Sequence, residues 1–487
     1  MTKAQILKEK KLVIAQTKKY APELGRLFDL DVKLKDFPKS LFNFQVAKEH
    51  QKRQGVIKEV INNKIGNFFG PDLKKDLKIN LDGKLAFNIA DHHQVLNDPF
   101  LTSANFISGA DKILVEEKAD AAIVISSGDV PPNNYFSKNG FTFHGKRVPI
   151  FSNSETEFCS YYIPKRDFDF IARLKLADRW KEFSKEEKDF LIGERERFKG
   201  LDFSRCENYL DQITLIIQKT WPNLFEKKLR HNLFELIYIT QEEVVSQSLI
   251  KILAEDNIIS RCLFDKKFRQ NILDNFRGIV VTWNEKEEKG THFFWRKYPG
   301  RLQSLRMYLK GDKLEPADQR FKSLAVPLER KTIVELLEKR EIYPSLFMIF
   351  GVLNFYAGIK PLVGYGSVTY LYLMKQAWAK TLKEFSLDDE IRLVENVQTD
   401  GLVAGLAVFF KRIHRQLKTL YAYDIFFDGG MSESYIKTVL DMKYGGFLEA
   451  ASVDLYDYIA KKYIPPPDRL KLNINFNDLA ATQFNWL

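Results

Sequence analysis

Residues 88–100, NIADHHQVLNDPF, are the part of the chain richest in side chains that could take part in chemistry. Asp91, His92 and His93 follow an apolar run that has the length of a strand. Side chains alternate along a strand, so Asp91 and His93 should share a face while His92 points away. A histidine beside a carboxylate is a natural general base, because its reference pKa lies near neutrality. We therefore predict that His93 and Asp91 are catalytic and that His92 binds substrate.

A second polar segment, SSGDVPPNN at residues 126–134, follows another apolar run. Asp129 is a further candidate for orienting the histidine, and Ser127 is a candidate nucleophile, although ISSGDV is not a GxSxG nucleophile elbow. Prolines in this loop prevent a helix from following, so its peptide N–H and amide groups are suited to holding a polar or anionic group. The predicted substrate-binding residues here are Ser126, Gly128, Asn133 and Asn134.

The same histidines raise the question of a metal site. A hairpin predicted for residues 135–152 could fold over the two polar segments and bring His144 close to them. Together, His93, Asp91 and His144 would form a His/His/carboxylate set, which suits zinc, iron or manganese. No HExxH motif accompanies the set, so a divalent metal ion is only a candidate and the cofactor is not predicted.

The alternative is that Asp91, His92 and His93 only cap the strand and bind nearby backbone. The tripeptide after an apolar run resembles the motif of the DHH phosphoesterases. That family also has aspartate motifs on earlier strands, and residues 1–80 contain no DxDG-like sequence, so we do not assign the chain to it.

Two other regions suit a polyanion. The net charge is +11, and residues 1–80 hold 18 lysines and arginines against 9 acidic residues. In residues 292–313, HFFWRKYPGRLQSLRMYLKGDK, cations alternate with aromatic side chains, a pattern that suits stacking on bases and pairing with phosphates. An outer strand with a buried aromatic side would produce the same pattern. Nucleic-acid binding is therefore the second functional hypothesis.

The elements that must position the first site form a strand–helix–strand unit. Residues 84–90 are predicted to form a strand, residues 100–119 a helix with Asp98 as N-cap and Pro99 at its first position, and residues 121–126 a second strand. A crossover of this length favours a parallel pair, so the loops after both strands should meet at one sheet edge. Asp82-Gly83 also predicts a hairpin that leads into the first strand.

The predicted fold class is an α/β core, on a mixed or parallel sheet, with large helical additions and several domains. A length of 487 residues exceeds the size of most single cores. The expected parts are a basic helical segment (1–75), the α/β core with the site loops (76–165), a helical region (166–275) and a mostly helical α+β region (276–487).

Several features favour a cytoplasmic protein. Cys159, Cys206 and Cys262 are far apart and form no CxxC pair, so neither a disulfide framework nor a cysteine zinc site is predicted. The N-terminus lacks the continuous apolar core of a signal peptide. Residues 342–359 carry no charge but include Pro344, Asn354 and Gly358, which favours a buried helix over a membrane segment.

These observations predict an enzyme that acts on a small polar or anionic substrate by hydrolysis or group transfer, metal-assisted if the metal set forms. The partner is the small-molecule substrate, with no membrane. The alternative is an RNA-binding protein that uses the basic N-terminus and residues 292–313, and a third possibility is a scaffold without chemistry. No oligomeric state is predicted.

Overall fold

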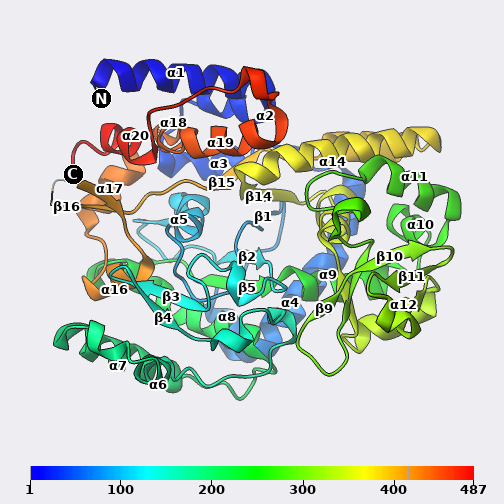
Figure 1. The fold of residues 1–487 in the computed structure, drawn as a ribbon, viewed down its shortest axis with the longest axis horizontal. Coiled ribbons are helices and arrows are strands. Elements are labelled where there is room, and N and C mark those ends of the chain that lie inside the picture. The colour runs from blue at the N-terminus through cyan, green and yellow to red at the C-terminus, as the bar shows by residue number, and fades with distance from the viewer. Residues whose placement is uncertain (1, 415) are drawn as a thin grey trace.

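The computed structural model describes residues 2–414 and 416–487, and for residues 71–76 it describes the backbone alone. At its centre is a five-stranded parallel sheet with the strand order β15-β14-β1-β2-β5 (Figure 1). Its strands are β1 (Ala86–Asn88), β2 (Ala122–Ser126), β5 (Leu236–Thr240), β14 (Lys360–Gly364) and β15 (Gly401–Ala404). The predicted α/β class with a parallel sheet and helical additions is confirmed.

The central strands form where short apolar runs rich in β-branched residues occur. β2 reads AIVIS and β5 reads LIYIT, and every residue of β5 is buried. Strands that are covered on both faces have no need of a polar alternation, which is why these segments are continuously apolar. The sheet draws strands from across residues 86–404, so the core is not confined to residues 76–165. The division into several domains remains a prediction.

Helices follow or precede each central strand. α5 (Pro99–Ser108) connects β1 to β2, with Asp98 accepting from the N–H groups of Phe100 and Leu101 as predicted for an N-cap. α8 (Tyr209–Thr220) packs against β5, α9 (Gln241–Ile252) follows β5, and α14 (Tyr365–Glu384) follows β14.

The remaining helices surround this core. α1 and α18–α20 lie together at one end of the molecule, and α6 and α7 lie at the opposite end (Figure 1). Their bounds are α1 (Lys3–Tyr20), α2 (Pro22–Gly25), α3 (Phe37–Leu41), α4 (Lys48–Asp76), α6 (Phe170–Leu176), α7 (Lys185–Lys199), α10 (Ile258–Phe264), α11 (Lys266–Phe276), α12 (Arg330–Glu338), α13 (Leu346–Phe350), α15 (Asp388–Asn396), α16 (Ala422–Phe427), α17 (Glu433–Asp441), α18 (Tyr444–Ala450), α19 (Ser452–Tyr463) and α20 (Phe476–Gln483).

The chain also forms several short antiparallel sheets outside the central sheet. The one used below has the order β13-β8-β9, with β13 (Ile342–Pro344), β8 (Phe294–Lys297) and β9 (Ser304–Leu305). The others are formed by β3 (Gly140–Phe143) with β4 (Lys146–Pro149), by β10 (Met307–Lys310), β11 (Lys313–Pro316) and β12 (Val326–Pro327), by β16 (Phe410–Ile413) with β17 (Gln416–Thr419), and by β6 (Trp283–Asn284) with β7 (Lys289–Gly290).

Two local predictions are corrected. Asp82-Gly83 forms no hairpin, because β1 is paired on both sides, with β14 and with β2, and has no free edge for an antiparallel partner. The helix predicted for residues 100–119 ends at Ser108, and a short 3₁₀ turn follows at Ala110–Lys112.

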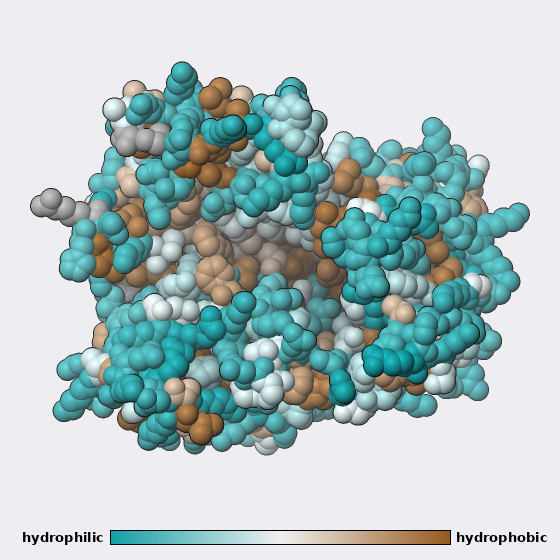
Figure 2. Space-filling view, in the orientation of Figure 1, coloured by the Kyte–Doolittle hydropathy of each residue, from teal (hydrophilic) through white to brown (hydrophobic). Residues whose placement is uncertain are grey.

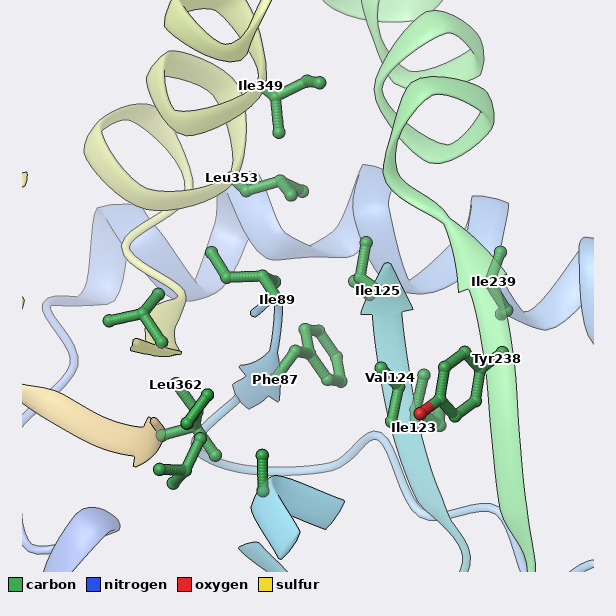
Figure 3. Close-up of a cluster of buried hydrophobic side chains, with 14 of the residues drawn as sticks. Phe87, Ile89, Ile123, Val124, Ile125, Tyr238, Ile239, Ile349, Leu353 and Leu362 are labelled. Atoms are coloured by element: carbon green, nitrogen blue, oxygen red, sulfur yellow. The ribbon is translucent and has the colours of Figure 1, made fainter. Parts of the chain in front are cut away.

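Residues 342–359 are buried, as predicted, apart from the half-buried Leu346, but only part of them is helical. Residues 342–344 form β13, and α13 continues into a π-helical turn at Gly351–Tyr356. Ile349 and Leu353 point from this helix toward Ile89 and Ile125 at the ends of the central strands (Figure 3). Among the described residues, no helix has the length and apolar character needed to cross a bilayer.

We expect Leu353→Ala to lower the free energy of unfolding by about 2–5 kcal/mol, because it removes buried methyl groups and leaves a cavity. Leu353 is 1% exposed, whereas Leu176, which offers the same substitution, is 91% exposed. Leu176→Ala should therefore stay within about 0.5 kcal/mol of wild type in urea unfolding. Equal losses in the two variants would contradict the buried position of the π-helical turn.

Candidate functional site

The loops after β1 and β2 lie side by side, as the sequence predicts. Asn88 of β1 is in register with Val124 of β2, and beyond the strands His92 and Ser127 form a further parallel bridge. The His93 N–H donates to the Ser127 carbonyl at 2.8 Å, and the Ser127 N–H donates to the Asp91 carbonyl at 2.9 Å. The polar segments are therefore continuations of two neighbouring strands at the carboxyl edge of the sheet.

Asp91 is held inside a polar network beneath this edge. It is 4% exposed, and its carboxylate accepts from the hydroxyl of Tyr238 and from the side-chain amide of Asn105 at 3.3 Å. Asn88 in turn donates to Asn105 at 2.9 Å. Burial raises the pKa of Asp91 to about 7. These contacts tie β1, α5 and β5 together, and they leave Asp91 without a path to a substrate in this conformation.

His93 shares the face of Asp91, as alternation requires, and is also enclosed. It is 1% exposed. Nε2 lies 2.9 Å from the Leu210 carbonyl, so Nε2 carries the proton, and Nδ1 accepts from the Ser126 hydroxyl at 2.8 Å. Burial lowers the pKa of His93 to about 3. The ring is therefore neutral, and its two hydrogen bonds connect the ends of β1 and β2 to α8.

His92 points to the other side of the sheet edge. It retains some exposed surface, and its buried Nδ1 has no hydrogen-bond partner among the described residues. Burial lowers its pKa to about 4. On the same side, Gln241 at the start of α9 donates to the Ser127 hydroxyl at 2.7 Å. Of the two histidines, His92 rather than His93 is therefore the one that a ligand could contact, together with Ser127.

Asp129 forms a carboxyl pair with Glu242, the second residue of α9. The two side chains are hydrogen-bonded, and the Gly128 N–H donates to Glu242 Oε2 at 2.8 Å. Burial raises the pKa of Asp129 to about 6, and burial together with the charge of Asp129 raises the pKa of Glu242 well above its usual value. Two adjacent carboxyl groups cannot both ionise cheaply, so Glu242 keeps the proton and donates it to Asp129.

The Tyr343 hydroxyl of β13 lies near the Asp129 carboxylate and acts against burial by lowering the pKa of Asp129. Tyr343 is 2% exposed, whereas Asp129 retains exposed surface. Glu242 and Tyr343 were not among the predicted site residues, because β5 and β13 were not identified as strands. The signal was present in ELIYITQEE, an apolar run that ends in polar residues like the other two.

The three residues of the predicted metal set do not come together. The ring of His144, in the β3–β4 turn, lies 2.9 Å from Glu187 of α7, and the backbone N–H of His144 donates to Asp424 at 2.7 Å. His93 and Asp91 instead bind residues of β2, α5, β5 and α8. Within residues 2–414 and 416–487, no group of three or more His, Cys, Asp or Glu side chains is arranged to hold a metal ion.

The asparagines predicted to bind substrate lie further along the loop. They form a 3₁₀ turn at Pro132–Asn134, in which the Asn133 N–H donates to the Thr156 carbonyl at 2.9 Å. Asn134 is exposed, and a side-chain oxygen of Asn133 is buried without a partner among the described residues. The centre of one face of the molecule is hollowed over the central strands, with hydrophobic residues on the floor and hydrophilic residues around it (Figure 2).

Comparison with protein-family models and with curated proteins finds no match to this chain.

Gly128→Ala should destabilise the protein by about 1–3 kcal/mol through overpacking. A Cβ at this position would lie 2.9 Å from Glu242 Oε2 and 2.9 Å from Leu210 Cδ1. Gly193 in α7 is the matched control, because its Cβ would meet nothing within 4 Å, and alanine there should be neutral or stabilising by up to about 1 kcal/mol. Thermal melting of the two variants measures the difference, and an unaffected Gly128→Ala would contradict the close approach of Glu242.

Asp91→Asn should remove a pH-dependent loss of stability. The pKa of Asp91 rises from 3.8 to about 7 on folding. Between about pH 4 and pH 7 Asp91 therefore ionises in the unfolded chain but not in the folded one, and the free energy of unfolding decreases as pH rises. The variant cannot ionise there, so its free energy of unfolding relative to wild type should increase across that window, by at most about 1.4 kcal/mol per pH unit, and level off above it.

Urea unfolding of both proteins between about pH 5 and pH 8 measures this difference. The buried histidines act in the opposite sense, since their pKa is lowered and their contribution is lost as pH falls below 6.5, but they are common to both proteins and cancel. A difference that does not change with pH would show that Asp91 is already ionised in the folded state.

Proposed function

We propose that this chain is an enzyme that acts on a small polar or anionic substrate by hydrolysis or group transfer at the carboxyl edge of its central sheet. The observation that carries the proposal is the Asp129–Glu242 pair. It stands where two neighbouring parallel strands end, which is where open α/β sheets bind ligands. A pair with one shared proton can both accept and donate a proton near neutral pH.

Each residue of the site has a separate role in this proposal. Asp129, which retains exposed surface, is the group that exchanges a proton with the substrate, and Glu242 holds the shared proton beneath it. His92 and Ser127 face the same edge and bind the polar part of the substrate. Asp91 and His93 act as supports, because their hydrogen bonds fix the ends of β1 and β2 in place.

The basic and aromatic stretch at residues 292–313 supports a small ligand more than nucleic acid. Its aromatic side chains are packed: Phe293 and Phe294 are both 0% exposed, and the Trp295 ring stacks at 6.5 Å on Tyr343. Lys310 and Lys313 pair with Glu315 at 3.3 and 3.0 Å. The two phenylalanines are therefore closed to stacking on bases, and two of the cations are already neutralised by Glu315.

Asp129→Asn should slow turnover by roughly 100-fold or more, the usual effect of losing a general acid–base group. The purified chain is incubated with a pool of small molecules extracted from cells, and mass spectrometry follows which compounds are consumed. Asp82→Asn, at an exposed carboxylate, is the matched control and should behave as wild type. Thermal melting checks that both variants fold.

Two results would contradict the proposal. One is a pool in which wild-type protein changes no compound. The other is a reaction that Asp129→Asn and Glu242→Gln carry out at the wild-type rate.

A further inference from the structure

A face of the β13-β8-β9 sheet looks toward the carboxyl pair. Trp295 of β8 stands opposite Tyr343 of β13, and Lys297 stands opposite Ser304 of β9. Opposed residues and residues two apart share a face, so Trp295, Tyr343 and Ser304 lie on the same side. The ring planes of Trp295 and Tyr343 are stacked at 18°. Tyr343 and Asp129 influence each other's pKa, which places this face next to the proposed active site.

A cavity of about 460 Å³ opens over this face. That volume is in the range of small-molecule sites. Its lining residues are Glu157, Glu288, Trp295, Tyr298, Gln303, Ser304, Leu305, Arg306, Ala317 and Asp318. At Ser304 the cavity reaches Tyr343, whose hydroxyl donates to Ser304 Oγ at 3.0 Å. Burial raises the pKa of Tyr343 well above its usual value, so its hydroxyl stays protonated.

Arg306 is the unsatisfied group of this cavity. Its guanidinium makes no ion pair or hydrogen bond with the described residues, and its Nε is buried without a partner. Leaving a donor of this kind unpaired and partly buried is costly. The acidic residues of the lining do not supply the partner: Asp318 is bonded by Arg320 at 2.6 Å, and Glu157 and Glu288 are exposed.

We infer that this cavity receives an oxyanion group of the substrate, a carboxylate or a phosphate, on Arg306, and that Ser304 and Tyr343 link it to the Asp129–Glu242 pair. A planar guanidinium binds both kinds of oxyanion through paired N–H donors. Trp295 supplies an apolar wall beside it. This inference rests on the proposed function for the chemistry that follows, but the binding step can be tested without turnover.

The test is calorimetric titration of the full-length protein with inorganic phosphate and, separately, with succinate. Wild type should bind at least one of them, and Arg306→Gln should weaken that binding by roughly 10-fold or more. Arg296→Gln is the matched control, since Arg296 lies in the same sheet, has a buried Nε without a partner, and does not line the cavity. It should bind within about 2-fold of wild type.

The link to the carboxyl pair has its own readout. Anion binding to wild type should strengthen as pH falls through the titration of Asp129, whose pKa is about 6. Among the groups around Asp129, Glu242, Tyr343 and Cys159 have raised pKa values, with Cys159 at about 12, so they remain protonated near neutral pH. Tyr343→Phe removes a hydroxyl that lowers the pKa of Asp129, so the midpoint should move to higher pH while binding at low pH is retained.

The outcomes separate this inference from the proposed function. Binding of phosphate alone assigns a phosphate group to the substrate, and binding of succinate alone assigns a carboxylate; both support the inference. Failure of both anions to bind, equal binding by Arg306→Gln and wild type, or an unchanged midpoint in Tyr343→Phe would overturn it. Asp129→Asn should lose the pH dependence yet keep anion binding, so a loss of turnover in that variant supports the proposed function independently.

Discussion

Parallel pairing of β1, β2 and β5 is the constraint on which the site depends. Because all three strands run in the same direction, the polar residues that follow them meet at one edge of the sheet. The pairing continues past the regular strands, through the bridge between His92 and Ser127. That extension places Gly128 where its N–H reaches Glu242, and it thereby fixes where the Asp129–Glu242 pair can form.

Alternation along these extended strands divides the polar residues into two groups with different surroundings. Asp91 and His93 point under α5 and α8, where both side chains are hydrogen-bonded to internal partners. His92 and Ser127 point to the opposite side and remain partly exposed. A one-residue change of register would exchange the two groups. The hydrogen bonds of Asp91 and His93 therefore fix the register of the strands, and this register exposes His92 and Ser127.

The sequence was sufficient to predict the elements that local signals define. The N-cap at Asp98, the strands at β1 and β2 and the meeting of their loops follow from short-range pattern. β5, β14 and β15 were missed, because five-residue apolar runs inside largely helical regions do not differ in periodicity from buried helix. His93 was favoured over His92 for the correct geometric reason, a shared face with Asp91, but sequence does not show which face is covered by α8.

The polar interior at this edge also argues against a purely structural role. Replacing a buried ionisable pair by apolar residues of similar size is often neutral or stabilising, so a scaffold has no physical need for one. The Asp91 network is fully hydrogen-bonded and serves to specify register. The Asp129–Glu242 pair does not connect strands in this way, because it joins the β2 loop to the adjacent helix α9. The pKa of Asp129 is about 6, and Asp129 remains partly exposed. A carboxyl pair of this kind lies near a cavity whose Arg306 has no ion pair among the described residues, and this arrangement supports the proposed binding of a charged substrate.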